Sequence, residues 1–438
     1  MRFLFSVGPA MRARLLAAGL VSFVLGGEID AGTTKTPYLQ NVKKRGVTFM
    51  WETVPARGGV VIVEGNGNVY RFTSSEQNSH ELPVEDLSPG TRYRYTVETG
   101  GESYLGEFAT SPEGTAAFSF VVYGDSRSNQ GTHTRVVERI RGEVPDFLLS
   151  TGDLVNDGAN LSDWSSFFFI EGPLLRDNVL FPALGNHDRQ GRGKTADNYR
   201  KYFSVPADSP NPERYYAFTY SNARFLVLDS NSHSFSLTEQ TAWLEEQLQV
   251  AHADPKIDHI FVSMHHPPFS VSLHGGQKQL RELWTPLFEE YEVGAVFAGH
   301  DHVYSRAERH GVRYFVSGGG GAPLYPRKHR DGSLDEETNR SFERVNHYIR
   351  IHVFESLVEI TAVRVDGSVI ETVTYGEAPR KHEPTPTAEH EASMGIPALG
   401  AQVVAGRQPK NGLLGWFGFV LAAGAGLLLF ASLFRSDR

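Results

Sequence analysis

Cysteine is absent from the 438 residues of this chain. Its absence excludes disulfides and thiolate ligands, so any metal site must use His, Asp, Asn or Tyr side chains. The sequence also lacks a long run of like charge, and its formal net charge is -9. Nucleic acid is therefore disfavoured as a bulk partner, because phosphate backbones select basic patches.

Two catalytic signatures are missing as well. No serine stands in a Gly-x-Ser-x-Gly elbow, which argues against a serine hydrolase. The run Gly318–Gly321 lacks the Gly-Lys-Ser/Thr ending of a P-loop, so we expect a tight turn there. The length and the 40% hydrophobic content suffice for a large core and suggest two or three domains.

The N-terminal end resembles an export signal. Arg2, Arg12 and Arg14 precede an apolar stretch over 15–25, and small residues with a polar turn follow. This order predicts a secretory signal peptide over 1–31. A disordered or core-packed N-terminus is the alternative.

The C-terminal end is apolar over Leu413–Phe434 and closes on two arginines. A bilayer needs about 20 such residues, so we expect a transmembrane helix over 412–434, with a buried core helix as the alternative. We therefore expect an exported protein, anchored to the membrane by this helix, with its catalytic domain outside the cytoplasm. Whether the mature protein keeps the helix stays open, as does the oligomeric state.

Residues 35–112 predict an all-β module. Strand-like runs such as Val60–Val63 and Val69–Phe72 alternate with turns. The stretch Leu87–Tyr95 is similar to the tyrosine corner of an immunoglobulin-type sandwich, in which a Tyr hydroxyl bonds back to the backbone. The module therefore resembles a fibronectin type III domain.

From 116 to 376 short apolar runs alternate with helical patterns, which predicts an α/β layered domain. A Pro-, Glu- and Thr-rich linker follows over 377–411. Five polar motifs each come directly after an apolar run, where the carboxyl ends of strands would gather them at one sheet edge. The motifs are Gly124-Asp125-Ser126-Arg127, Gly152-Asp153-Leu154, Gly185-Asn186-His187-Asp188, His265-His266 and Gly299-His300-Asp301-His302.

These motifs, in this order, resemble those of the calcineurin-like metallophosphoesterase superfamily. With the preceding module, which begins Pro37-Tyr38-Leu39-Gln40, the chain is similar to a purple acid phosphatase-type member over roughly 37–375. The resemblance implies a layered β-sandwich flanked by helices. It also implies two divalent or mixed-valence metal ions, of Fe, Zn or Mn, that share one carboxylate.

The resemblance assigns roles to the motif residues. Asp153 would bridge the two metals, His187 would act as general acid or phosphate clamp, and Asp188 would orient the His187 ring. The other implied ligands are Asp125 and His302 for the first metal, and Asn186, His265 and His300 for the second.

Two positions depart from the family pattern. Arg127 stands where many members have a ligating His, and Asn156 stands where the purple enzymes have a Tyr. The first metal site is thus one ligand short, and either the Asn156 amide oxygen or water would complete it. Arg127 would either grip a substrate phosphate or form a structural salt bridge. Beside the ligands, His266 is expected to support them, and His274 to line the substrate side or stay an exposed loop residue.

The implied function is hydrolysis of small phosphate esters by attack of a dimetal-bound hydroxide. A phosphomonoesterase similar to acid phosphatases is the first expectation. The alternatives are a phosphodiesterase acting on nucleotides or lipid head groups, and a non-catalytic surface binding protein with a degenerate metal site.

Overall fold

The computed structural model describes residues 32–190, 195–211, 214–232 and 236–377. The described residues all belong to the first of the two units into which contacts divide the chain. The predicted signal peptide, nearly all of the predicted linker and the segment 412–434 lie outside the described residues. The predicted boundary between the β module and the α/β domain stays a prediction, because both belong to the first unit.

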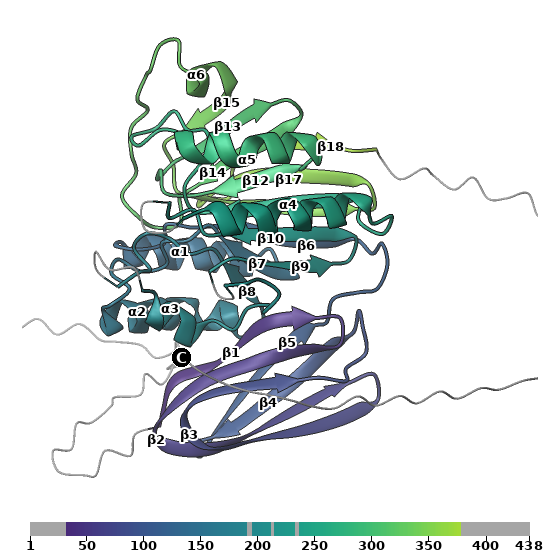
Figure 1. The fold of residues 1–438 in the computed structure, drawn as a ribbon. Coiled ribbons are helices and arrows are strands. Elements are labelled where there is room, and N and C mark those ends of the chain that lie inside the picture. The colour runs from purple at the N-terminus through teal and green to yellow at the C-terminus, as the bar shows by residue number, and fades with distance from the viewer. Residues whose placement is uncertain (1–31, 191–194, 212–213, 233–235, 378–438) are drawn as a thin grey trace, which may run out of the picture. The chain divides into compact units, whose positions relative to one another are not determined.

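Five antiparallel strands form the N-terminal β region that the sequence predicts (Figure 1). Over Arg92–Thr99, inward and outward side chains alternate in burial, as the period of two along a strand requires. The Tyr93 hydroxyl accepts a hydrogen bond from the Ser88 backbone N–H at 2.8 Å, as a tyrosine corner requires. Membership of the fibronectin class stays a prediction. The strands are β1 (Thr33–Lys43), β2 (Gly46–Gly65), β3 (Asn68–Val84), β4 (Arg92–Thr99) and β5 (Glu102–Ala109).

The β region packs against the rest of the unit through specific contacts. The hydroxyl of Tyr38 donates to the carbonyl of Tyr202 at 2.8 Å. Glu52 accepts hydrogen bonds from Lys35 and from Lys201, which lies across the contact. The β region is therefore joined to the α/β region through the buried Tyr38 and through an ion pair between Glu52 and the exposed Lys201.

The α/β region consists of two sheets stacked face to face. One has the strand order β18-β17-β16-β6-β7-β8 and the other β15-β13-β14-β12-β11-β10-β9. The strands of the first sheet are β6 (Phe118–Tyr123), β7 (Phe147–Ser150), β8 (Leu180–Pro182), β16 (His347–Phe354), β17 (Leu357–Arg364) and β18 (Val369–Tyr375). Those of the second are β9 (Tyr216–Tyr220), β10 (Ala223–Leu228), β11 (His259–Met264), β12 (Ala295–Ala298), β13 (Tyr304–Arg309), β14 (Val312–Ser317) and β15 (Asn339–Glu343).

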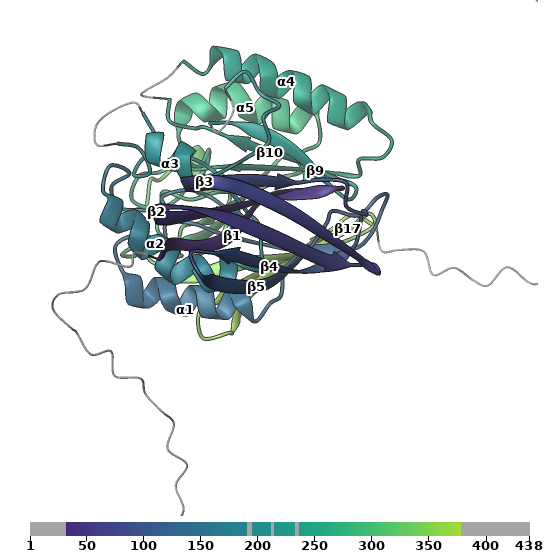
Figure 2. The same cartoon turned by 90° about the horizontal axis from the view of Figure 1, so that it is seen from below.

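Helices cover the outer faces of the two sheets. Figure 2 shows α4 and α5 on one side of the sheets and α1 and α2 on the other. Asn129 and Asn160 cap α1 and α2, since each side chain accepts a backbone N–H of the first turn. The helices are α1 (Gln130–Arg141), α2 (Leu161–Leu175), α3 (Asp197–Tyr202), α4 (Thr238–Ala253), α5 (Lys278–Glu290) and α6 (Leu334–Thr338).

The central strands read as continuous apolar runs because both of their faces are buried. In β10, Phe225 and Val227 belong to the core between the sheets, while Leu226 and Leu228 pack with the helices. Aromatic rings fill the inter-sheet space; the centroid of Phe120 lies 5.2 Å from that of Phe225. The predicted layered β-sandwich flanked by helices is therefore confirmed.

One part of the predicted fold class is wrong, namely the C-terminal transmembrane helix. No helix among the described residues is long and apolar enough to cross a membrane. The longest, α4, has 16 residues, fewer than the roughly 20 that a bilayer requires.

Candidate metal centre

Three of the predicted ligands occupy strained backbone just beyond the strand ends. Asp125 and Asp153 both have φ of 55°, and His300 has φ of 66°. Such positive values are uncommon for residues with a side chain, and they concentrate at functional sites. Gly185 allows the close approach of two loops, because a Cβ there would lie 2.3 Å from a carboxylate oxygen of Asp153.

A first group of donors consists of Asp125, Asp153 and His302, whose ligand atoms lie within 4.8 Å of one another. His302 Nδ1 donates to the carbonyl of Pro323 at 2.7 Å, so in the neutral ring the lone pair is on Nε2. That atom lies 3.4 Å from Asp125 Oδ1, which is buried and makes no hydrogen bond to any described residue. A cation between the two would satisfy both atoms.

The interaction between Asp125 and His302 also shifts the pKa of the imidazole. Burial lowers the pKa of His302, but the Asp125 carboxylate outweighs burial and raises it overall. The other Asp125 oxygen accepts the backbone N–H of His300 at 2.9 Å. Asp125 is therefore held in place by the motif that supplies the next ligands.

A second group consists of His265, His266 and His300, again within 4.8 Å of one another. The Asn186 amide oxygen joins it, at 3.0 Å from His265 Nε2 and 3.0 Å from His300 Nδ1. His265 donates its Nδ1–H to the Thr151 carbonyl at 2.9 Å, which leaves Nε2 as an acceptor. Support of a ligating imidazole by a backbone carbonyl is usual in metal sites.

Burial and neighbouring rings favour the neutral form of His300 in the second group. Burial, and then the neighbouring imidazoles of His266 and His265, lower the pKa of His300 far below its ordinary value. A neutral imidazole presents a lone pair, which is the form that binds metal. His266 lies close enough to be a ligand, and its Nδ1 is 3.0 Å from the Ser230 hydroxyl, so its role as ligand or support stays open.

Asp153 connects the two groups. It belongs to the first group, and its Oδ1 lies 3.3 Å from Nε2 of His265 in the second. Its side chain is 1% exposed. Although burial opposes ionisation, the charges of His265, His187 and Arg127 lower the pKa of Asp153. An ionised carboxylate that borders both groups would be able to hold two ions of the Zn, Mn or Fe type, as predicted for Asp153.

The two motif residues after Asn186 hold the loops around Asp153. His187 donates Nδ1–H to the Asn156 carbonyl at 2.7 Å, and its backbone N–H to Asp153 Oδ1 at 2.9 Å. The carboxylate of Asp188 does not contact that ring; it accepts four backbone N–H groups, from Asp153, Leu154, Val155 and Gly185, at 2.7–3.2 Å. Asp188 therefore does not orient the His187 ring as predicted, because four buried backbone N–H groups already use both of its carboxylate oxygens.

Comparison with known proteins agrees with this geometry. Residues 118–304 match the calcineurin-like phosphoesterase family. The chain contains a calcineurin-like metallophosphoesterase domain.

Relatives of the metallophosphoesterase domain include phosphatases. The chain is 30% identical to an uncharacterised protein of Mycobacterium tuberculosis over 57% of its own length and 54% of that protein. It is 27% identical to a purple acid phosphatase of Glycine max, over 60% of each chain. A solved purple acid phosphatase from yellow lupin (Lupinus luteus) seeds shares the fold, with a TM-score of 0.65, 18% identity and coverage of 78% and 74%. The chain spans less than two thirds of these two curated relatives.

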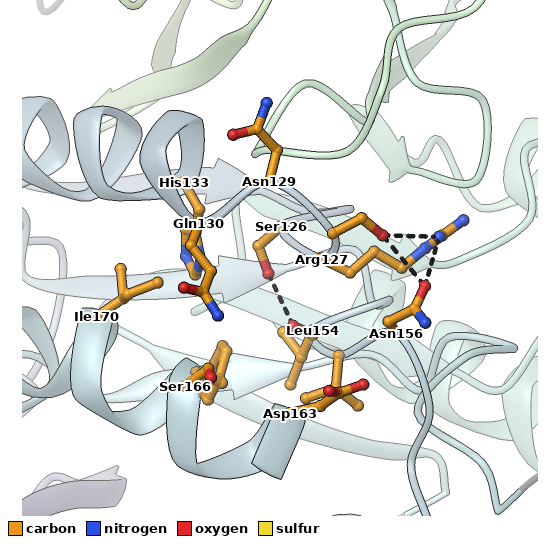
Figure 3. Close-up of a pocket in the computed structure, with 13 residues that line it drawn as sticks. Ser126, Arg127, Asn129, Gln130, His133, Leu154, Asn156, Asp163, Ser166 and Ile170 are labelled. Carbon is orange, nitrogen blue, oxygen red and sulfur yellow. Dashed lines mark hydrogen bonds between the residues drawn. The ribbon is translucent and has the colours of Figure 1, made fainter. Parts of the chain in front are cut away.

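Arg127 and Asn156, the two departures from the family pattern, contact each other in the metallophosphoesterase domain. The Arg127 Nε donates to Asp153 Oδ2 at 3.1 Å. Its Nη1 donates to the Asn156 amide oxygen at 3.3 Å (Figure 3). Ser128 Oγ donates to the same oxygen at 3.1 Å. The Asn156 oxygen is thus engaged by neighbours, and its role as a ligand stays a prediction. The structural ion pair considered for Arg127 is present.

Two aromatic side chains border the metallophosphoesterase site on its other side. The ring of Tyr325 stacks on that of His302, with centroids 4.0 Å apart. The ring of His274 lies 4.4 Å from His300 and 5.5 Å from Tyr325. His274 is exposed and its ring lies beside that of His300, so its place on the substrate side stays a prediction. Tyr325 was not anticipated, because it stands in no motif and only the loop after the glycine run 318–321 brings it there.

Proposed function

We propose that this protein is a metal-dependent phosphomonoesterase. The observation that carries the proposal is Asp153, a buried carboxylate of the first donor group whose Oδ1 lies 3.3 Å from Nε2 of His265 in the second group. Such an arrangement suits two cations, and few other chemistries need neutral imidazoles and carboxylates gathered in this way. Phosphatases among the relatives of the chain support the same class of reaction.

The proposed reaction uses two metals together with the side chains of His187 and Arg127. When two metals are bound, they act as Lewis acids that lower the pKa of water and stabilise phosphoryl charge. His187 is the candidate acid: its Nδ1–H is held by the Asn156 carbonyl, so the protonated ring gives up its Nε2 proton to the departing ester oxygen. Arg127, which is paired with Asp153, brings positive charge beside the place where the phosphoryl group would bind.

The test compares p-nitrophenyl phosphate with bis-p-nitrophenyl phosphate, with and without a chelator. We expect faster turnover of the monoester, loss of activity with chelator and recovery with Zn, Mn or Fe. Faster turnover of the diester would favour the phosphodiesterase alternative. No turnover of either ester with any of these metals would favour a non-catalytic binding protein.

A variant ties the activity to the site. Asp153→Ala removes the shared carboxylate, so we expect loss of bound metal by elemental analysis and a fall in activity of at least about a hundredfold. Asp331→Ala, at an exposed aspartate in the loop before α6, is the matched control and should change neither quantity. Unchanged metal content in Asp153→Ala would overturn the assignment.

Two finer points belong to the same proposal. The metals are a pair drawn from Fe, Zn and Mn, and Asn156 in place of a tyrosine means that no tyrosinate colour arises at that position. Export is proposed from the arginine-then-apolar pattern over 1–31. Fractionation of cells that express the full chain tests it, and recovery of the protein only from the cytoplasm would contradict it.

A further inference from the structure

A groove lies between α1 and α2, beside the metal centre (Figure 3). Its volume is about 570 Å³, within the range of pockets that hold small molecules. Arg127 and Asn156 line one end, and Gln130, Ser166 and Ile170 line the other. A second hollow shares the last three residues and continues outward along the helices.

Asn156 connects the groove to the proposed chemistry. Its carbonyl holds the ring of His187, while its side chain lines the groove next to Arg127. Arg127 in turn is paired with Asp153 at 3.1 Å. A phosphate ester whose leaving oxygen meets His187 can therefore extend its alcohol part past Asn156 into the groove.

The charges of the lining exclude additional phosphate groups. Among the described residues that line the groove, Arg127 is the one permanently cationic side chain, and Asp153 already pairs with it. Asp163 adds a carboxylate, which is held by the backbone N–H of Asp157 and the side chain of Asn160. A second phosphate in the groove would meet this negative charge without a compensating cation.

The remaining lining suits a neutral group with hydroxyls and a ring. Gln130 and Ser166 offer an amide and a hydroxyl. At the outer end Ile170 and Phe169 are apolar, and Phe169 is 84% exposed on α2. From Asp163 to Ile170 the helix rises about 10 Å, which gives room for a sugar followed by a base.

We propose that this groove binds the alcohol part of the substrate and selects a nucleoside, so that the preferred ester is a nucleoside monophosphate. The proposal rests on the phosphomonoesterase function proposed above. Past Asn156, the sugar hydroxyls meet Gln130 and Ser166, and the base packs on Phe169 at the outer end.

The first experiment measures kcat/KM for adenosine 5′-monophosphate and for glycerol 1-phosphate, which is too short to reach Phe169. Phe169→Ser removes the exposed ring, and we expect kcat/KM for the nucleotide to fall about fivefold, as loss of one ring contact implies. The value for glycerol 1-phosphate should not change. Leu161→Ser, at a 58% exposed leucine of the same helix outside the groove lining, is the matched control. Equal changes for both substrates, or none for the nucleotide, would overturn the proposal.

The second experiment separates the groove from the catalytic activity. Adenosine, which carries no phosphate, is titrated into the metal-loaded protein and into the chelator-treated protein and followed by NMR. We expect binding in both states that Phe169→Ser weakens and Leu161→Ser does not. Adenosine binding without phosphatase activity would support the groove as a nucleoside site and contradict the proposed phosphomonoesterase function. Phosphatase activity without adenosine binding would contradict the groove as a nucleoside site and leave the proposed phosphomonoesterase function supported.

Discussion

Replacing Asp188 by Asn removes one oxygen from a buried carboxylate that accepts four backbone N–H groups. Oδ2 accepts from Asp153 and Gly185, both at 2.9 Å, and Oδ1 accepts from the two residues after Asp153. The Asn side chain keeps a single oxygen, so two donors would face an NH2 group. A buried donor without an acceptor costs at least about 1 kcal/mol, so two cost about 2 to 4 kcal/mol. Solvent does not relieve this cost, because Asp188 is 0% exposed.

Urea unfolding of Asp188→Asn with chelator present measures the stability loss apart from metal binding. Elemental analysis of the metal-loaded variant shows whether the loops around Asp188 still hold the metal ligands in place. We expect less bound metal than in the unchanged protein. Asp366→Asn is the matched control, since Asp366 also accepts a backbone N–H, from Ser368 at 2.8 Å, but lies in an exposed turn. A loss below about 0.5 kcal/mol, with normal metal content, would refute the role assigned to the four hydrogen bonds.

Two further predictions concern the contact with the β region and the proposed acid. Burial alone would raise the pKa of Glu52, but hydrogen bonds and charges from its two lysine partners lower it overall. Its stabilisation is therefore complete above about pH 4.5 and is lost as the pH falls through the lower folded pKa. We expect Glu52→Gln to cost about 1 kcal/mol at pH 7 and progressively less below pH 4 in urea unfolding; a pH-independent difference would contradict this. His187→Ala should lower kcat about a hundredfold for alkyl phosphates and much less for p-nitrophenyl phosphate, whose leaving group needs little protonation. Equal losses for both esters would exclude His187 as the acid.

The sequence alone was sufficient for the layered α/β fold and for the neighbourhood of the motif residues. Apolar runs such as Ile260–Met264 mark strands buried on both faces, and polar motifs follow them directly. Because parallel strands such as β6 and β7 end at the same edge, residues that follow them meet there even when distant in the chain. The pattern of apolar residues therefore carried the information about the site. The same kind of pattern predicted a membrane helix at 412–434, whereas no helix among the described residues is long and apolar enough to cross a membrane.

Only the tertiary structure decided the partners of the polar side chains. Asp188 lies next to His187 in the sequence, yet its carboxylate meets the backbone of another loop. Arg127 reaches Asp153, 26 positions away, and Tyr325 stacks on His302 from a loop without a motif. A hydrogen bond or a ring contact depends on where two loops meet within a few tenths of an ångström, and side-chain type and spacing along one strand do not determine that distance. The groove between α1 and α2 arises in the same way, because it exists only once both helices have packed on their sheet.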